Sequence, residues 1–358
     1  MNNITIPFLS RISLVEKFNF YEYISVMLDG GVSISETLSS VKTKITNPYF
    51  VEKISELETY VSSWDSVSKS MKKLPQIFSS SEISIIEAGE SIWKLSSTLS
   101  QLAENLRKNY ELRKKVKTSL TYPLIIFLFL ILAIVIVLVY VIPAVSELFE
   151  NAETELPIAT QMLVASSDFV ITHWALIIVV LLMILFGLYA YINTETGKAN
   201  YDYFLLRLPL VGKVYRNYLL AHFSTLLWVL VSSWVPIVKS ISLASKSLDN
   251  LVYQSHLEES IEKISAWEKI TTSLQGVDTE NKLFPLDYLQ MLSVGEKTAS
   301  LGDVTKKLTE QYTREVDYSL ANLTKWIEPL AILISWVFVL WFAFAIFWAI
   351  LQVTQTVS

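Results

Sequence analysis

The residues able to do acid–base or metal chemistry are few in this chain and far apart. Its 358 residues include no cysteine and only three histidines, His173, His222 and His256. Catalysis and metal binding both need several such groups in one place, and these histidines are separated by dozens of residues. A lone histidine on a helix is satisfied or solvated far more often than it is a ligand. We therefore expect no enzyme activity, no bound cofactor and no metal ion.

The glycines do not form a phosphate-binding loop. Gly212-Lys213 is followed by Val214 instead of Ser or Thr, and the glycine that should precede it is absent. The protein is therefore not expected to hydrolyse ATP, and any energy for its work must come from a partner. The formal net charge of −5 and the pI of about 5.4 also argue against nucleic acid as a partner.

Two acidic motifs recur and could bind a partner. Glu87-Ala88-Gly89-Glu90 has a counterpart in Val294-Gly295-Glu296. We expect both to be turns at the start of a long amphipathic helix, whose dipole stabilises an acidic side chain by about 0.3 to 1 kcal/mol. The alternative is a docking surface, because the same turn occurs twice. Its candidate residues are Glu87, Gly89, Glu90, Gly295 and Glu296.

A basic run precedes the first apolar stretch. It consists of Arg113, Lys114, Lys115 and Lys117. We interpret it as a juxtamembrane determinant of topology, because each such charge gains about 1 kcal/mol beside anionic lipid headgroups. A site for the acidic surface of an ATPase is the alternative.

Three apolar stretches predict helices that cross a membrane. The chain is 52% hydrophobic and only 18% charged, and residues 124–142, 174–192 and 330–351 contain no Asp, Glu, Lys, Arg or His. At about 1.5 Å per residue these stretches reach roughly 27 to 33 Å, the thickness of a hydrocarbon core. Uncharged spans are interpreted as anchors and packing surfaces. A permease, the alternative, would have to line its path by oligomerisation.

The charges are sorted by side. Residues 1–123 hold fifteen Lys and Arg, residues 193–329 hold fourteen, and no other segment has any. The segment 143–173 carries five acidic residues, which predicts that it is external, and no cleavable signal peptide precedes the first bundle. We therefore predict a multi-pass inner-membrane protein with a cytoplasmic amino terminus. Its expected segments are a cytoplasmic helical bundle (1–123), a first span (124–142), an acidic periplasmic loop (143–173), a second span (174–192), a second cytoplasmic bundle (193–329), a third span (330–351) and a periplasmic tail (352–358).

The two cytoplasmic segments are copies of one another. Gly89-Glu90 matches Gly295-Glu296 at an offset of 206, and Tyr122-Pro123 matches Glu328-Pro329 at the same offset. Near the start of each copy the offset is 203, as between Phe20 and Phe223. The drift between offsets indicates a small insertion in a loop, where insertions are tolerated.

Both copies are predicted to be helical. Leucines in the first copy recur at helical spacing and no sustained period-two alternation suggests a sheet, so we expect bundles of five to seven helices. The fold class is therefore an all-α membrane protein with two duplicated bundles and three transmembrane helices. Asp29-Gly30-Gly31 is expected to end one helix, because glycine takes the left-handed conformation freely. The second copy has Ser232-Ser233-Trp234 there, so we expect its turn to be made differently.

Several motifs, in order and spacing, resemble the GspF/PilC family, the inner-membrane platform proteins of type IV pilus assembly and type II secretion. The resemblance covers nearly the whole chain. It rests on Tyr-Pro entering the first span, Pro with Leu-Phe leaving it, a Leu-Pro-Leu-Val-Gly-Lys signature after the second span, and Glu-Pro before the third. The matching family-motif residues are Tyr122, Pro123, Pro143, Pro209, Gly212, Glu328 and Pro329.

The chain departs from the family pattern at three glycines. The second glycine of the Gly-Glu turn is lost in both copies, and the glycine before Val-Pro-Ile in the second copy is Trp234. These departures indicate a divergent type IVb or conjugative thin-pilus branch.

The resemblance implies a mechanical function. It implies a platform that couples a cytoplasmic hexameric assembly ATPase to the extraction and polymerisation of prepilins, in contact with membrane lipid and other inner-membrane assembly proteins, as a homo-oligomer. The alternative is the same role for a pseudopilus in type II secretion.

Overall fold

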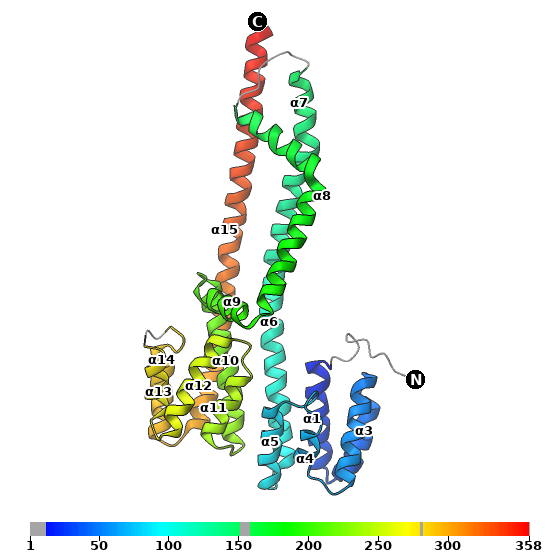
Figure 1. Cartoon of the computed structure of the whole chain (residues 1–358), viewed down its shortest axis with the longest axis vertical. Coiled ribbons are helices and arrows are strands. Elements are labelled where there is room, and N and C mark those ends of the chain that lie inside the picture. Colours follow the sequence, from blue (N-terminus) through cyan, green and yellow to red (C-terminus); the bar gives the residue numbers. More distant parts are fainter. Residues whose placement is uncertain (1–11, 151–157, 280–281, 358) are drawn as a thin grey trace. The chain divides into compact units, whose positions relative to one another are not determined.

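The computed structural model describes residues 12–150, 158–279 and 282–357, and every regular element in them is helical (Figure 1). The chain forms two compact units. Unit 1 combines Met1–Lys115 with Asp202–Tyr318, and unit 2 combines Val116–Tyr201 with Ser319–Ser358. Both sequence copies thus belong to one unit, and the apolar stretches belong to the other.

The first copy has six α-helices among its described residues. Polar side chains set their starts: Ser13 and Ser79 cap α1 and α5 through reciprocal capping boxes with Glu16 and Glu82, and Asn47 caps α3. The helices are α1 (Leu14–Asp29), α2 (Ile34–Val41), α3 (Pro48–Ser62), α4 (Val67–Lys72), α5 (Ser80–Ser91) and the first part of α6 (Leu95–Ile136), with a short 3₁₀ turn η1 (Lys42–Lys44).

The second copy repeats this order. Its described residues form α10 (Val211–Ser232), α11 (Ile237–Lys246), α12 (Leu251–Ser265), α13 (Ile270–Val277), α14 (Leu286–Lys297) and the first part of α15 (Leu301–Val357). Both copies therefore fall within the predicted five to seven helices. Helix α12 lies 203 residues after α3, whereas α14 lies 206 after α5, so the three extra residues lie between α13 and α14.

The two cores are built alike around buried aromatic rings. Phe20 and Phe78 are buried in the first copy, and Phe223 and Phe284 are buried at the same positions of the second. One buried pair differs. Lys17 forms a 2.8 Å ion pair with Glu82 in the first copy, where the second copy has the uncharged residues Leu220 and Tyr288.

Among the described residues, three helices are long and apolar enough to cross a membrane, and their apolar stretches lie in unit 2. The candidate spans lie within Leu95–Ala144, Thr160–Ile192 and Leu301–Trp348. They involve α6, α15 and α8 (Ile158–Ile192), with a π-helical turn η2 (Val137–Val141) and α7 (Ile142–Glu150) after α6, and α9 (Glu195–Arg207) after α8.

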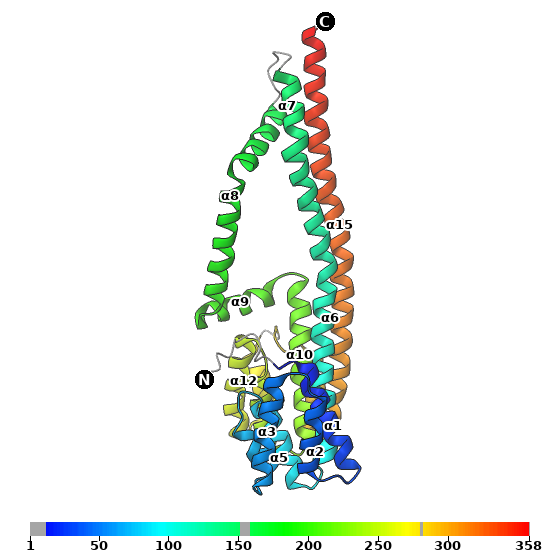
Figure 2. The same ribbon diagram turned by 90° about the vertical axis from the view of Figure 1, so that its right-hand side faces the viewer.

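The segment expected as an acidic loop, 143–173, is largely helical where it is described. It contains most of α7 and the first part of α8, which departs from helical geometry at His173 (φ −113°, ψ 16°). Figure 2 shows the bend that divides α8 into two parts. The first part is held by the Thr160 hydroxyl, which donates to the carbonyl of Ala345 at 2.8 Å, and by a buried cluster of Ile142, Leu163 and Ala345.

Candidate functional site

The Glu90 carboxylate caps a helix other than the one expected. Gly89 and Glu90 lie in the last turn of α5, so the expectation that they begin the long amphipathic helix is wrong. The two Glu90 oxygens instead accept the backbone N–H groups of Val67 (2.6 Å) and Ser68 (3.1 Å), at the start of α4. The Ser68 hydroxyl also donates to Glu90. A carboxylate at this end of α4 satisfies amides that lack partners in the helix.

The second copy repeats this arrangement. Glu296 lies near the end of α14, and its carboxylate accepts the N–H of Ile270 at 2.8 Å and the hydroxyl of Thr271 at 3.0 Å, at the start of α13. The dipole argument therefore holds for both carboxylates, but it concerns the preceding short helix. Sequence reasoning could not find this partner, because it is 22 to 26 residues away.

The two glycines permit close helix packing. A Cβ atom added at Gly89 would lie 2.5 to 2.9 Å from side-chain atoms of Thr98 on α6. A Cβ at Gly295 would lie 3.0 Å from Val304, which is the equivalent position on α15. A side chain at Gly89 would therefore force α5 and α6 apart, whereas at Gly295 a small shift of Val304 would make room.

Glu87 is the most accessible of the predicted docking residues that carry a charge. Its side chain is about half exposed and pairs with Lys72 at 2.7 Å and with Lys239 of α11 at 3.9 Å. The hydrogen bond from Lys72 lowers the pKa of Glu87. Partial burial raises this pKa, but the charges of Lys72 and Lys239 lower it further, so the pKa is lowered overall. Because Lys239 belongs to the second copy, this pair joins the two copies within unit 1.

In the described part of the chain, six helix-ending turns use a left-handed residue, at three equivalent positions in each copy. Each residue lies two positions after a helix end, where glycine is strongly favoured. The pairs are Gly31 (φ 79°) with Trp234 (φ 63°), Trp64 (φ 66°) with Trp267 (φ 69°), and Trp93 (φ 57°) with Ala299 (φ 52°).

The expectation that the second copy makes its Ser232-Ser233-Trp234 turn differently is therefore wrong. The N–H of Val235 donates to the carbonyl of Leu230 at 3.0 Å, as the N–H of Val32 donates to Met27 at 3.1 Å in the first copy. Trp234 takes the left-handed conformation that Gly31 takes, because the hydrogen-bonded turn fixes the backbone whatever the side chain.

Four of the six left-handed residues are exposed tryptophans. Trp64, Trp93, Trp234 and Trp267, here called the tryptophan turns, are 98, 95, 77 and 97% exposed. The left-handed conformation costs a residue with a side chain about 1 kcal/mol relative to glycine, and an exposed indole recovers none of this by packing. Sequence reasoning missed these residues as a group. The available signal was that Trp93 and Trp234 replace glycines of the resembled family.

The tryptophan turns lie at one end of unit 1. Glu90 holds the start of α4, just after Trp64, against the end of α5, which Trp93 follows. Glu296 does the same for the start of α13, just after Trp267. Trp234 lies two residues after Ser232. The Ser232 hydroxyl oxygen is 3.6 Å from the position that a Cβ atom on Gly302 would occupy, so this turn lies near the start of α15. This is the end at which α6 and α15 begin, before either helix reaches its apolar stretch.

The four juxtamembrane basic residues are exposed on α6, and two of them connect the copies. Arg113 lies 3.3 Å from Asp249, and Lys115 lies 2.5 Å from Asp317. The ammonium of Lys114 lies 5.9 Å from the ring centre of Tyr110. Of the four residues, only Lys117 belongs to unit 2. Exposed pairs of this kind contribute at most about 1 kcal/mol each.

The family-motif residues have separate structural roles. Tyr122 donates to Glu328 at 3.2 Å, and the prolines after them, Pro123 and Pro329, lie inside α6 and α15. Pro143 lies in the first turn of α7, where its missing N–H is tolerated.

The Pro209–Gly212 motif joins α9 to α10. Leu210 adopts φ 65° there, and the N–H of Val211 donates to the carbonyl of Pro209 at 2.8 Å. A Cβ at Gly212 would lie 2.4 Å from the carbonyl oxygen of Leu206, so only glycine fits.

His222 is the one buried histidine of the described residues and joins the copies. Its Nδ1 lies 2.8 Å from Oδ1 of Asn109 on α6. Burial, followed by the nearby charge of Arg113, lowers the His222 pKa to about 4. Within the described ranges, no three His, Cys, Asp or Glu side chains are grouped to hold a metal ion.

Known proteins resemble the chain over both copies. A family model described as type II secretion system (T2SS), protein F, matches residues 20–143 and 223–349. The chain is 29% identical to type IV pilus assembly protein PilC of Thermus thermophilus over 95% of its own length and 82% of that protein. The values for PilC of Pseudomonas aeruginosa are 25%, 95% and 90%. For type II secretion system protein F of the same species they are 24%, 94% and 82%.

Proposed function

The chain belongs to the family of type II secretion system protein F, the GspF/PilC family, and on this premise we propose that it is a platform protein of type IV pilus assembly. The carrying observation is that both copies match the family, while the relatives named for pilus assembly cover nearly the whole chain. In this role the protein is not an enzyme. It transmits the conformational cycle of a cytoplasmic hexameric ATPase to prepilins in the inner membrane.

The proposed topology has both copies in the cytoplasm and three spans. All 29 Lys and Arg residues lie in the two bundle segments, as expected for the cytoplasmic side. The structure supports this topology, because both copies form one compact unit from which α6 and α15 continue into candidate spans. Two copies packed together must lie on the same side of the membrane.

The proposed docking surface for the ATPase is the set of tryptophan turns, with Glu87 beside them. Glu90, Glu296, Gly89 and Gly295 shape these turns from within, since the carboxylates are already hydrogen-bonded and the glycines are covered. Tryptophan is among the residues that dominate binding energy at protein interfaces. The backbone of these four tryptophans is strained and their indoles are exposed to water. A partner that covers the indoles would explain both features.

A retention experiment tests this surface. The full chain, purified in detergent and immobilised, is incubated with the cognate assembly ATPase, and the retained ATPase is quantified. Trp93→Gly combined with Trp267→Gly should lose most of the retention, because both contacts disappear while glycine fits both turns. Leu286→Ser is the matched control, since Leu286 is also exposed but begins α14 at its other end. Equal retention by all three proteins would contradict the docking surface.

A platform for a type II secretion pseudopilus is the second candidate, because protein F of that system covers a similar share of the chain. Cross-linking in cells separates the two. If the protein assembles type IV pili, residues of the candidate spans should cross-link to the major pilin. Cross-linking to a pseudopilin alone would show that the protein acts in type II secretion.

A further inference from the structure

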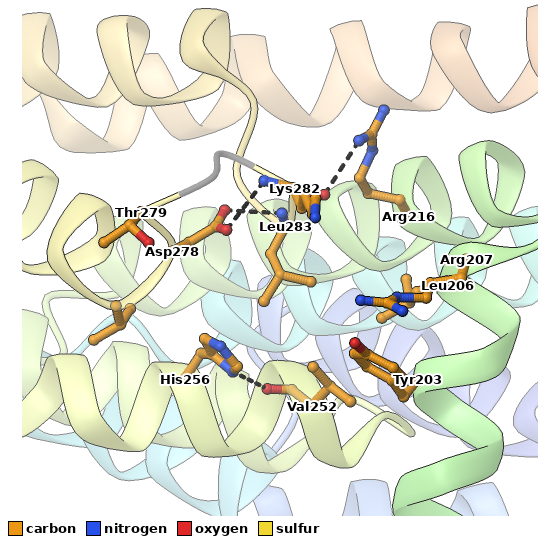
Figure 3. Close-up of a pocket in the computed structure, with 11 residues that line it drawn as sticks. Tyr203, Leu206, Arg207, Arg216, Val252, His256, Asp278, Thr279, Lys282 and Leu283 are labelled. Carbon is orange, nitrogen blue, oxygen red and sulfur yellow. Dashed lines mark hydrogen bonds between the residues drawn. The ribbon is translucent and has the colours of Figure 1, made fainter.

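A pocket of about 480 Å³ in unit 1 gathers basic side chains within the second copy (Figure 3). Its described lining residues come from the end of α9, the start of α10, the first half of α12, the end of α13 with the two residues after it, and Lys282 and Leu283 before α14. The polar residues that matter are Tyr203, Arg207, Arg216, His256, Asp278 and Lys282.

The two arginines of the pocket have no carboxylate partner among the described residues. The guanidinium of Arg207 lies 4.2 Å from the ring centre of Tyr203, and it forms no ion pair there. Arg216 donates from Nη1 to the carbonyl of Lys282 at 3.1 Å. Its Nε is buried and has no hydrogen-bond partner within the described part of the chain. A buried donor of this kind is expected to have an acceptor.

Asp278, the one acidic side chain among the described lining residues, is already used. Its two oxygens accept the backbone N–H groups of Lys282 (3.0 Å), Leu283 (2.8 Å) and Phe284 (2.7 Å). Figure 3 shows this carboxylate turned toward the backbone of the segment that it holds. It therefore shapes one wall of the pocket, and among the described lining residues the basic side chains outnumber this one carboxylate.

Two basic residues of the pocket, Arg216 and Lys282, have no basic counterpart in the first copy. The positions that correspond to Arg216 and Lys282 in the first copy are Ser13 and Gln76. The wall with Asp278 and Lys282 lies where the second copy has its three extra residues. The first copy folds into the same bundle without these basic residues. Their presence in the second copy therefore points to a role in binding.

Along the chain, the first residues of this pocket come shortly after a candidate span. Helix α8 ends at Ile192, α9 begins at Glu195, and Tyr203 follows the span by eleven residues. Helix α9 also leaves aromatic side chains in solvent, with Phe204 59% exposed beside Tyr201 and Tyr203. Aromatic and basic residues on a helix next to a span are typical of the membrane interface.

We propose that this pocket binds the phosphodiester headgroup of an anionic phospholipid from the leaflet that faces unit 1. Arg207 and Arg216 bind the phosphate oxygens, Lys282 adds positive charge, and the ring of Tyr203 orients the Arg207 guanidinium. Arginine suits this role because its planar donors match phosphate geometry. The site rests on the proposed topology of the platform protein, and it would anchor the second copy to the bilayer.

The test uses the full chain in nanodiscs, without any pilus component. Nanodiscs of phosphatidylcholine with or without phosphatidylglycerol are compared by thermal unfolding, and phospholipids retained after detergent extraction are measured by native mass spectrometry. The wild-type chain should retain phosphatidylglycerol, and Arg207→Gln or Arg216→Gln should bind it about tenfold more weakly. Lys213→Gln, an exposed change on the same segment outside the pocket, should bind it normally.

Several outcomes would overturn the proposal. One is equal retention of the two lipids, and another is the same loss in the Lys213 variant as in the arginine variants. Tight binding of inorganic phosphate or ADP to the pocket, with no preference for phosphatidylglycerol, would replace the lipid by a soluble anion. Circular dichroism identifies an unfolded variant, and Arg207→Gln, whose side chain is exposed, serves if Arg216→Gln does not fold. Because no ATPase or pilin is used, the result is independent of the platform assignment.

Discussion

The hydroxyl of Tyr122 donates a hydrogen bond to the carboxylate of Glu328, and these two residues hold the same position in the two copies. Each stands one residue before a proline, at the point where α6 and α15 continue into their apolar stretches. Residues related by the internal duplication thus meet directly in unit 2. The contact is favourable because one copy supplies a donor at this position and the other copy an acceptor.

This pairing predicts an order of stabilities. Tyr122→Phe should lower the thermal unfolding midpoint of the detergent-purified chain slightly, because only the donor is lost. Tyr122→Glu places the residue of the second copy in the first and should lower the unfolding midpoint more, because two carboxylates then face each other. A glutamate variant as stable as the phenylalanine variant would show that the pair does not interact in solution.

The two packing glycines predict unequal costs. Gly89→Ala should destabilise the chain by about 2 kcal/mol, because the added methyl overlaps Thr98 and the helices must separate. Gly295→Ala should cost less, since its nearest contacts with Val304 are 3.0 Å. Chemical denaturation of both variants measures the difference, and an equal or reversed order contradicts the packing shown here.

The tryptophan turns predict a gain in stability from glycine. Trp64→Gly and Trp267→Gly should each raise the free energy of unfolding by about 1 kcal/mol, because the left-handed conformation becomes unstrained and no buried contact is lost. Trp64→Ala and Trp267→Ala are the matched controls. They remove the same indole but keep a Cβ, so their stability should stay near that of the wild type.

The buried Lys17–Glu82 pair predicts a strongly non-additive double variant. Lys17→Leu alone should cost about 3 kcal/mol, because it leaves the Glu82 carboxylate buried without its partner. Lys17→Leu with Glu82→Gln should recover much of that loss, since glutamine is neutral and can still accept from the N–H of Ser79. A double-mutant cycle in urea measures the coupling. Additive losses would mean that the buried pair contributes nothing.

His222 predicts a loss of stability in mild acid. Its pKa in the folded chain, about 4, lies below the ordinary value of 6.5, so the unfolded chain binds a proton first as the pH falls. Stability should therefore fall between pH 6.5 and about 4, by at most about 3 kcal/mol from this group. His222→Gln should flatten that part of the profile, measured as unfolding free energy against pH. An unchanged slope would show that His222 is not buried in neutral form.

Much of the fold followed from local patterns, whereas the site did not. The apolar stretches and the helical spacing of the leucines depend on residues close together in the chain, and the repeat offsets come from comparing one stretch of sequence with another. The Gly89–Glu90 motif was recognised because it recurs 206 residues later. Its partner was missed, because whether Glu90 caps α4 or begins α6 depends on how α5 folds back.

The sequence by itself determined the helical class, the duplication, the three apolar helices and the sided distribution of charge. These features follow from composition and periodicity along short stretches, and from comparing one stretch of the sequence with another. Only the three-dimensional structure decided that Glu90 and Glu296 hold distant helix ends, that four tryptophans stay in water in left-handed turns, and that Arg207 and Arg216 line one pocket. The exposure of the tryptophans, the carboxylate caps and the pocket depend on how segments far apart in the chain lie together, and that arrangement exists only once the helices have packed.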